Sequence, residues 1–170
     1  MTHYLPIVAV GVLLFIGAAA DLLHRKVPNL VSGAVLATGV VTQLISTGFW
    51  GMGASVLAGL GVGAFLILGW SARLIGGGDV KLAATAAVCV GWSQLPVYLF
   101  ATAIAGGIVS IACYLASSRQ AQASMRSNLA AGAYGLAPAV ATPSGGRFPV
   151  PYGVAIAAGA LFALVKGSLT

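Results

Sequence analysis

Two carboxyl groups are the side chains of this sequence best suited to chemistry. Asp21 and Asp79 are the only acidic residues among 170, and each stands at the end of a long apolar run beside basic residues. When two carboxyl groups share a partly desolvated site, they do not both ionise readily, so one of them keeps its proton. Such a pair can activate water as a base and polarise a peptide carbonyl as an acid, which is the chemistry of aspartic proteases.

Three consecutive glycines, Gly76, Gly77 and Gly78, directly precede Asp79. Because glycine has no Cβ atom, this stretch can turn sharply and admit an extended substrate to the backbone. A structural interpretation stays open beside the catalytic one, with Asp79 as a helix N-cap and Asp21 as a partner of a neighbouring basic side chain, His24 or Arg25. The absence of any third acid favours function, since ordinary surface needs would use more than two.

The composition predicts an integral membrane protein. Hydrophobic residues make up 59% of the chain and charged residues 6%, whereas a soluble domain carries about 25% charged residues. The mean hydropathy is +1.03. The eight Lys and Arg residues occur singly or in pairs between apolar runs, so the net charge of +6 does not indicate a nucleic-acid partner. We expect an all-α, polytopic bundle of about six transmembrane helices.

The apolar runs define the elements that must position the two aspartates. They cover residues of about 4–20, 30–46, 52–70, 80–90, 96–116 and 150–165. The connections 21–29, 71–79 and 117–149 are the predicted cytoplasmic loops of one domain, 1–170. Within the longest, residues 119–133 favour an interfacial helix and the following residues a loop or re-entrant chain. Glycines in the third run either allow close helix packing or are merely tolerated: they are Gly53, Gly59, Gly61 and Gly63.

The distribution of basic residues predicts the topology. Seven of the eight follow the first, third and fifth runs, namely Arg25, Lys26, Arg73, Lys81, Arg119, Arg126 and Arg147, and only Lys166 follows the last. Because basic loops stay in the cytoplasm, this pattern predicts six spans with both termini outside. Asp21 and Asp79 are then expected at the same, cytoplasmic face, although they are 58 positions apart. An ionisable residue at such a place marks a functional site.

Three ordered blocks resemble the motifs of the type IV prepilin peptidases, which are GxGD-type aspartic membrane endopeptidases. The first is Asp21-Leu22-Leu23-His24-Arg25-Lys26-Val27-Pro28-Asn29, with basic residues and then an apolar residue, Pro and Asn after the aspartate. The second is Gly76-Gly77-Gly78-Asp79-Val80-Lys81-Leu82, and the third, Pro-aromatic-Gly, block is Val150-Pro151-Tyr152-Gly153-Val154-Ala155-Ile156-Ala157. Their order and spacing match, so the resemblance covers nearly the whole chain.

The resemblance implies a multi-pass protein of the bacterial cytoplasmic (inner) membrane, in contact with lipid, that cuts the leader from prepilins after a glycine at the cytoplasmic face. It implies catalysis by Asp21 and Asp79, with no metal and no cofactor. Residues that border or shape the site are expected to be Gly76, Gly77, Gly78, Lys81, Pro151, Tyr152 and Gly153, with Lys81 favoured as an orientation anchor.

The chain starts directly at its first span, without the insertion with paired Cys-x-x-Cys motifs that longer members carry. It therefore resembles the short, CpaA/TadV-like form that serves tight-adherence (Flp-type) pili. The N-methyltransferase activity of longer members does not carry over with this resemblance. Two rivals remain, a small proton- or ion-coupled transporter that uses the same carboxylates and a non-catalytic pilus-assembly subunit.

Overall fold

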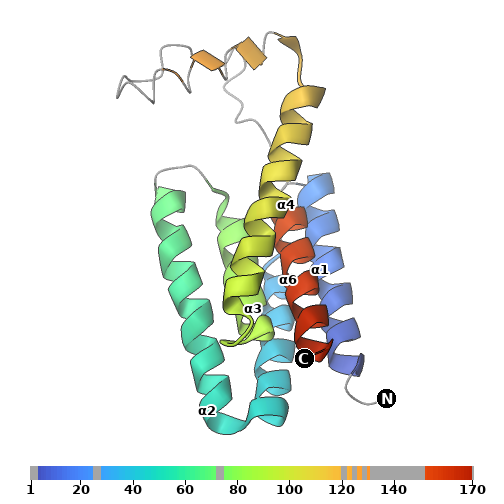
Figure 1. Cartoon of the computed structure of the whole chain (residues 1–170), viewed down its shortest axis with the longest axis vertical. Helices are drawn as coiled ribbons and strands as arrows, with labels where there is room; N and C mark the ends of the chain where they lie inside the picture. Colours follow the sequence, from blue (N-terminus) through green and yellow to red (C-terminus); the bar gives the residue numbers. More distant parts are fainter. Residues whose placement is uncertain are drawn as a thin grey trace. The chain divides into compact units, whose positions relative to one another are not determined.

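The computed structural model describes residues 4–24, 28–71, 75–119, 122–123, 126–127, 130 and 152–169, with side chains omitted at 4–7 and 22–24. These residues form helices and no strand, in agreement with the predicted all-α fold. The helices are α1 (Tyr4–His24), α2 (Asn29–Ser71), α3 (Gly77–Val90), α4 (Leu95–Ala116) and α6 (Tyr152–Leu169) (Figure 1). The chain divides into two parts, residues 1–106 with 151–170 and residues 107–150, and each is described by itself.

Helix α2 contains two of the predicted apolar runs and reverses direction at Gly48. This glycine has φ 70° and ψ −172°, a left-handed φ that other residues rarely adopt. Before the turn, Gly39 packs against Cys89; after it, Gly59 packs against Val88 and Gly63 against Ala84. The first half of α2 therefore runs parallel to α3 and the second half antiparallel to it, as the two blue-green segments in Figure 1 show.

Helices α1, α3 and α6 have one end in common. Gly11 lies against Leu161 and Asp21 against Gly153, so α1 and α6 are antiparallel. Gly17 lies against Leu82 of α3 and Asp21 interacts electrostatically with Asp79, so α1 is antiparallel to α3 as well. The C-terminal end of α1 thus meets the N-terminal ends of α3 and α6. This common end carries both aspartates.

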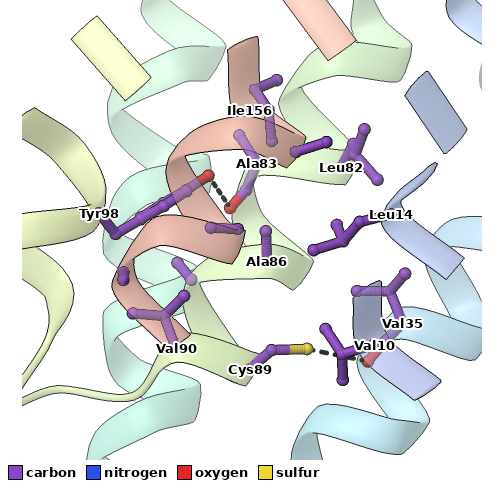
Figure 2. Close-up of a cluster of buried hydrophobic side chains, with 14 of the residues drawn as sticks. Val10, Leu14, Val35, Leu82, Ala83, Ala86, Cys89, Val90, Tyr98 and Ile156 are labelled. Atoms are coloured by element: carbon purple, nitrogen blue, oxygen red, sulfur yellow. Dashed lines mark hydrogen bonds between the residues drawn. The ribbon is translucent and has the colours of Figure 1, made fainter. Parts of the chain in front are cut away.

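Small apolar side chains form the core around α3. Alanines occupy much of the buried face of α3 and α6, so the helix backbones approach closely, and larger side chains from α1, α2 and α4 fill the remaining space (Figure 2). Two buried side chains donate hydrogen bonds to helix carbonyls: Tyr98 Oη to Ala83 O at 3.1 Å and Cys89 Sγ to Val35 O at 3.2 Å. These bonds satisfy polar atoms that no water reaches in such a core.

The glycines of the third apolar run divide into two groups. A Cβ atom on Gly59 would collide with Val88 Cγ2, and one on Gly63 would lie 3.3 Å from Ala84 Cβ. At Gly53 and Gly61 a Cβ atom would meet nothing within 4 Å. Close packing against α3 therefore explains Gly59 and Gly63, whereas Gly53 and Gly61 are merely tolerated in the helix.

The described residues of each predicted apolar run are helical. In the described residues, three helices are long and apolar enough to cross a membrane: α2, α4 and α6. Many large apolar side chains face outward, among them Phe15 at 71% and Phe100 at 70% exposure, as expected of a protein surrounded by hydrocarbon. These features are those of a membrane protein. The number of six spans, the position of both termini outside and the single domain remain predictions.

Residues 107–150 contain the end of α4 and the start of the long connection. Gln122 Nε2 donates hydrogen bonds to the carbonyl oxygens of Tyr114, at 3.0 Å, and Ser117, at 3.1 Å, and so caps the helix end. Arg126 Nε donates to the hydroxyl of Tyr114 at 2.7 Å. Only part of the predicted interfacial helix 119–133 is described, and the predicted loop or re-entrant chain 134–149 lies outside the described residues.

Candidate active site

Asp21 lies in the last turn of α1, because the helix continues past the apolar run to His24. Its side chain is buried, with 8% exposure. A carboxylate near a helix C-terminus faces the partial negative charge of the last carbonyl groups, which is unfavourable. A compensating donor comes from another helix: the backbone N–H of Gly153 donates a hydrogen bond to Asp21 Oδ2 at 2.9 Å.

Gly153 is the second residue of α6, where helical N–H groups have no partner within the helix. A Cβ atom at this position would lie 2.9 Å from both Cβ and Oδ2 of Asp21. Any larger residue would therefore displace the carboxyl group from the amide. The glycine of the third sequence block is thus explained by its close approach to Asp21.

Asp79 lies in the first turn of α3 and is also buried, with 8% exposure. The N-cap is Gly76, which has extended φ −71° and ψ 142° and accepts a hydrogen bond from Val80 N at 3.2 Å. Asp79 is therefore the third residue of the helix and not its N-cap, although its carboxyl group does have a backbone hydrogen bond, with Gly76. A Cβ atom on Gly76 would lie 2.9 Å from Asp79 Oδ2, so each aspartate has a glycine directly against its carboxyl group.

The two aspartates are coupled electrostatically. Asp79 precedes the predicted span 80–90, and burial raises the pKa of its carboxyl group from 3.8 to about 6; the charge of Asp21 adds to this rise and a backbone hydrogen bond with Gly76 opposes it. Within the described residues, Asp79 Oδ1 is buried without a hydrogen-bond partner. The structure thus brings together the two acidic residues that the sequence places 58 positions apart.

Most of the remaining predicted site residues lie in the first turns of α3 and α6. Gly77 and Gly78 form the start of α3 beside Asp79, and Tyr152, half-buried, begins α6 beside Gly153. Lys81 is exposed, and its Nζ donates a hydrogen bond to Asn29 Oδ1 at 3.0 Å. This contact joins α3 to the start of α2 and agrees with an anchoring role. Pro151 lies outside the described residues.

Trp70 is a neighbour of the site that the sequence did not reveal. A Cβ atom on Gly77 would lie 3.3 Å from Trp70 Nε1, so the indole ring near the end of α2 lies directly against this glycine. The sequence shows only an aromatic residue at the end of an apolar run, a pattern typical of the membrane interface. Contact with Gly77 depends on the turn between α2 and α3, which no local pattern predicts.

Two buried carboxyl groups flanked by glycines can perform general acid–base catalysis on a peptide bond. The model of the type IV leader peptidase family matches residues 8–111, which is more than half of the chain and includes both aspartates. No curated protein and no solved structure matches the chain. From this match, the chain belongs to the type IV leader peptidase family and is a peptidase.

Proposed function

We propose that this protein is an aspartic endopeptidase that removes the leader peptide from type IV prepilins of the Flp (tight-adherence) type. In this proposal it cuts after a glycine, at the cytoplasmic face of the bacterial inner membrane, with Asp21 and Asp79 as the catalytic residues. The observation that carries the proposal is the coupling of these two buried carboxyl groups, the only acidic side chains of the chain, across α1 and α3.

The reaction uses one ionised and one protonated carboxyl group. The carboxylate takes a proton from water, whose oxygen bonds to the carbonyl carbon, while the carboxylic acid gives its proton to the carbonyl oxygen. In the tetrahedral intermediate that results, the carbon–nitrogen bond then breaks. The first carboxyl group passes its proton to the leaving nitrogen, and the second recovers a proton from a hydroxyl group. The products are one carboxylic acid and one amine, and the enzyme is unchanged.

The transporter alternative requires carboxyl groups near the middle of the membrane. Asp21 lies in the last turn of α1 and Asp79 in the first turn of α3, so both are at helix ends. Such positions suit a site open to the cytoplasm, where water for hydrolysis is present. The assembly-subunit alternative requires no chemistry from either carboxyl group and leaves their coupling unexplained.

The proposal is tested with purified protein in lipid vesicles. An Flp-type precursor with its basic leader is added, and the products are identified by mass spectrometry. Release of the leader with a new N-terminus directly after the glycine supports the proposal. Precursor that stays intact contradicts it, and a proton flux across the vesicle membrane in the absence of precursor would support the transporter instead.

A further inference from the structure

The indole ring of Trp70 lies against the glycine run that leads to Asp79. A Cβ atom on Gly77 would lie 3.3 Å from Nε1 of the ring, 3.7 Å from Cδ1 and 4.0 Å from Cε2, so the edge that carries the N–H group faces this glycine. In the same turn the side chain of Ile75 packs on Gly69, where a Cβ atom would lie 2.9 Å from Ile75 Cδ1. These contacts hold the ring beside Gly77, two positions before a proposed catalytic residue.

Gly76 and Gly77 form an exposed surface next to the carboxyl group of Asp79. Both glycines are exposed, whereas Asp79 is buried. A Cβ atom on Gly76 would lie 2.9 Å from Asp79 Oδ2, so the carboxyl group contacts the first glycine and the indole ring contacts the second. Because neither glycine has a side chain, an extended peptide can lie along the pair and approach the carboxyl group and the ring together.

The Trp70 side chain has a free donor at this place. It is 54% exposed, and among the described residues its Nε1–H has no hydrogen-bond acceptor. An indole N–H can only donate, and a peptide backbone along the glycine pair would offer carbonyl oxygens to it. The ring itself is large and rigid, which is why tryptophan is enriched where proteins bind other chains.

On the basis of the proposed function, we propose that Trp70 is a substrate-binding residue. Its ring packs on the extended segment of the precursor that crosses Gly76 and Gly77, and its Nε1–H donates a hydrogen bond to a backbone carbonyl of that segment. Because this bond is made to the backbone, it positions the precursor without selecting a particular side chain. A tryptophan near a span end is also typical of the membrane interface, so contact with lipid alone is the outcome that opposes the proposal.

The positions of the three tryptophans allow a direct test of the contact. Trp50, just after the turn at Gly48, and Trp92, just after α3, lie at the end of α3 opposite to Asp79. In Trp50→Phe/Trp92→Phe protein, Trp70 is therefore the only tryptophan, and the addition of Asp79→Asn leaves bound precursor uncut. A tryptophan-free precursor should shift the emission to shorter wavelength and reduce quenching by acrylamide until binding saturates.

An unrelated transmembrane peptide of the same length is the control for this measurement, and it should leave the emission unchanged. Equal responses to the two peptides, or no response to the precursor, would overturn the proposal. The Trp50→Phe/Trp92→Phe protein with Asp79 intact is assayed in parallel and should cleave the precursor, which shows that the replaced tryptophans are not needed for binding.

Cleavage kinetics separate binding of the precursor from support of the glycine backbone. Trp70→Phe keeps a ring and removes the N–H donor, whereas Trp70→Leu removes the ring. We expect KM to rise about fivefold in Trp70→Phe and about tenfold or more in Trp70→Leu, with kcat within about twofold of the wild type. Trp92→Phe and Trp92→Leu are the matched controls and should keep the wild-type KM. A fall in kcat at unchanged KM would make Trp70 a support for Gly77 and overturn the proposal.

These outcomes can be distinguished from failure of the proposed function. Precursor that the wild type leaves intact overturns the proposed function itself. Precursor that the wild type cleaves, with the same KM in both Trp70 variants, overturns only the role of Trp70. If Trp70→Leu does not fold, the kinetics of Trp70→Phe and the emission of Trp70 still decide.

Discussion

The backbone amide of Gly153 donates a 2.9 Å hydrogen bond to the carboxyl group of Asp21, across 132 positions of the sequence. It joins the first turn of α6 to the last turn of α1, two helix ends that would otherwise leave a donor unused and a carboxylate unfavourably placed. The family match ends at residue 111. Helix α6 thus lies outside the matched residues and still contacts one of the two proposed catalytic groups.

Stability should depend on pH through Asp79. The pKa of this carboxyl group rises from 3.8 to about 6 in the folded protein, so the contribution of Asp79 to stability is largest below pH 3.8 and is lost as the pH rises through about 6. Asn resembles the neutral form at every pH. The melting temperature of Asp79→Asn in detergent should therefore exceed that of the wild type at about pH 8 and approach it at about pH 4. A difference that is constant or larger at the lower pH contradicts this expectation.

Gly76→Ala should impair catalysis more than folding. The added Cβ atom would lie 2.9 Å from Asp79 Oδ2, so the carboxyl group must move, while the extended backbone of Gly76 suits alanine without strain. Precursor cleavage should fall by about tenfold or more, with protein level and melting temperature near those of the wild type. Gly33→Ala is the matched control and should cleave normally. Full activity of Gly76→Ala would show that the position of Asp79 is not critical.

Lys81 should prove to be an anchor. Its Nζ bonds to Asn29 at an exposed position, and exposed contacts of this kind contribute about 1 kcal/mol or less. We expect Lys81→Met and Asn29→Ala each to change the cleavage rate by less than about threefold. The double variant should resemble either single variant, since the two residues share one contact. Complete loss of cleavage with Lys81→Met and normal cleavage with Asn29→Ala would instead assign Lys81 to catalysis.

The packing of α2 on α3 should be sensitive at Gly39. A Cβ atom there would lie 2.6 Å from Cys89 Sγ and 3.1 Å from the Cys89 backbone. Overpacking of this kind destabilises a core by about 1–3 kcal/mol, so Gly39→Ala should lower the melting temperature in detergent. Gly53→Ala, in which the new Cβ atom meets nothing within 4 Å, should leave it unchanged. Equal melting temperatures for the two variants would contradict the close approach at Gly39.

Much of the fold follows from the lengths of the apolar runs and the distribution of charge. Long apolar runs form helices because the backbone must satisfy its own hydrogen bonds in lipid, and the predicted boundaries agree with the helix ends to within a few residues. The extension of α1 to His24 was not predicted, because the apolar run from which the span was predicted ends just before the polar residue at position 21. The structure also assigns the sharp turn between two runs to Gly48, a residue that the sequence pattern does not distinguish from its neighbours.

The site was only partly readable from the sequence. Rarity identified Asp21 and Asp79, because two acids in a basic, apolar chain stand out. The contacts around the two groups depend on tertiary structure: the Gly153 amide reaches Asp21 only when α6 packs on α1, and Trp70 contacts Gly77 only after the chain turns into α3. No local pattern contains this information.

The most direct test of the account is precursor cleavage in membranes by wild type, Asp21→Asn and Asp79→Asn. Asn keeps the shape of the side chain and removes its acid–base function. Lys166→Gln, a change of charge in the last turn of α6, serves as a control that should cleave normally. The account predicts complete loss of cleavage in both Asn variants at normal protein levels. Cleavage that persists in either variant would contradict a catalytic pair and reduce that aspartate to a structural role.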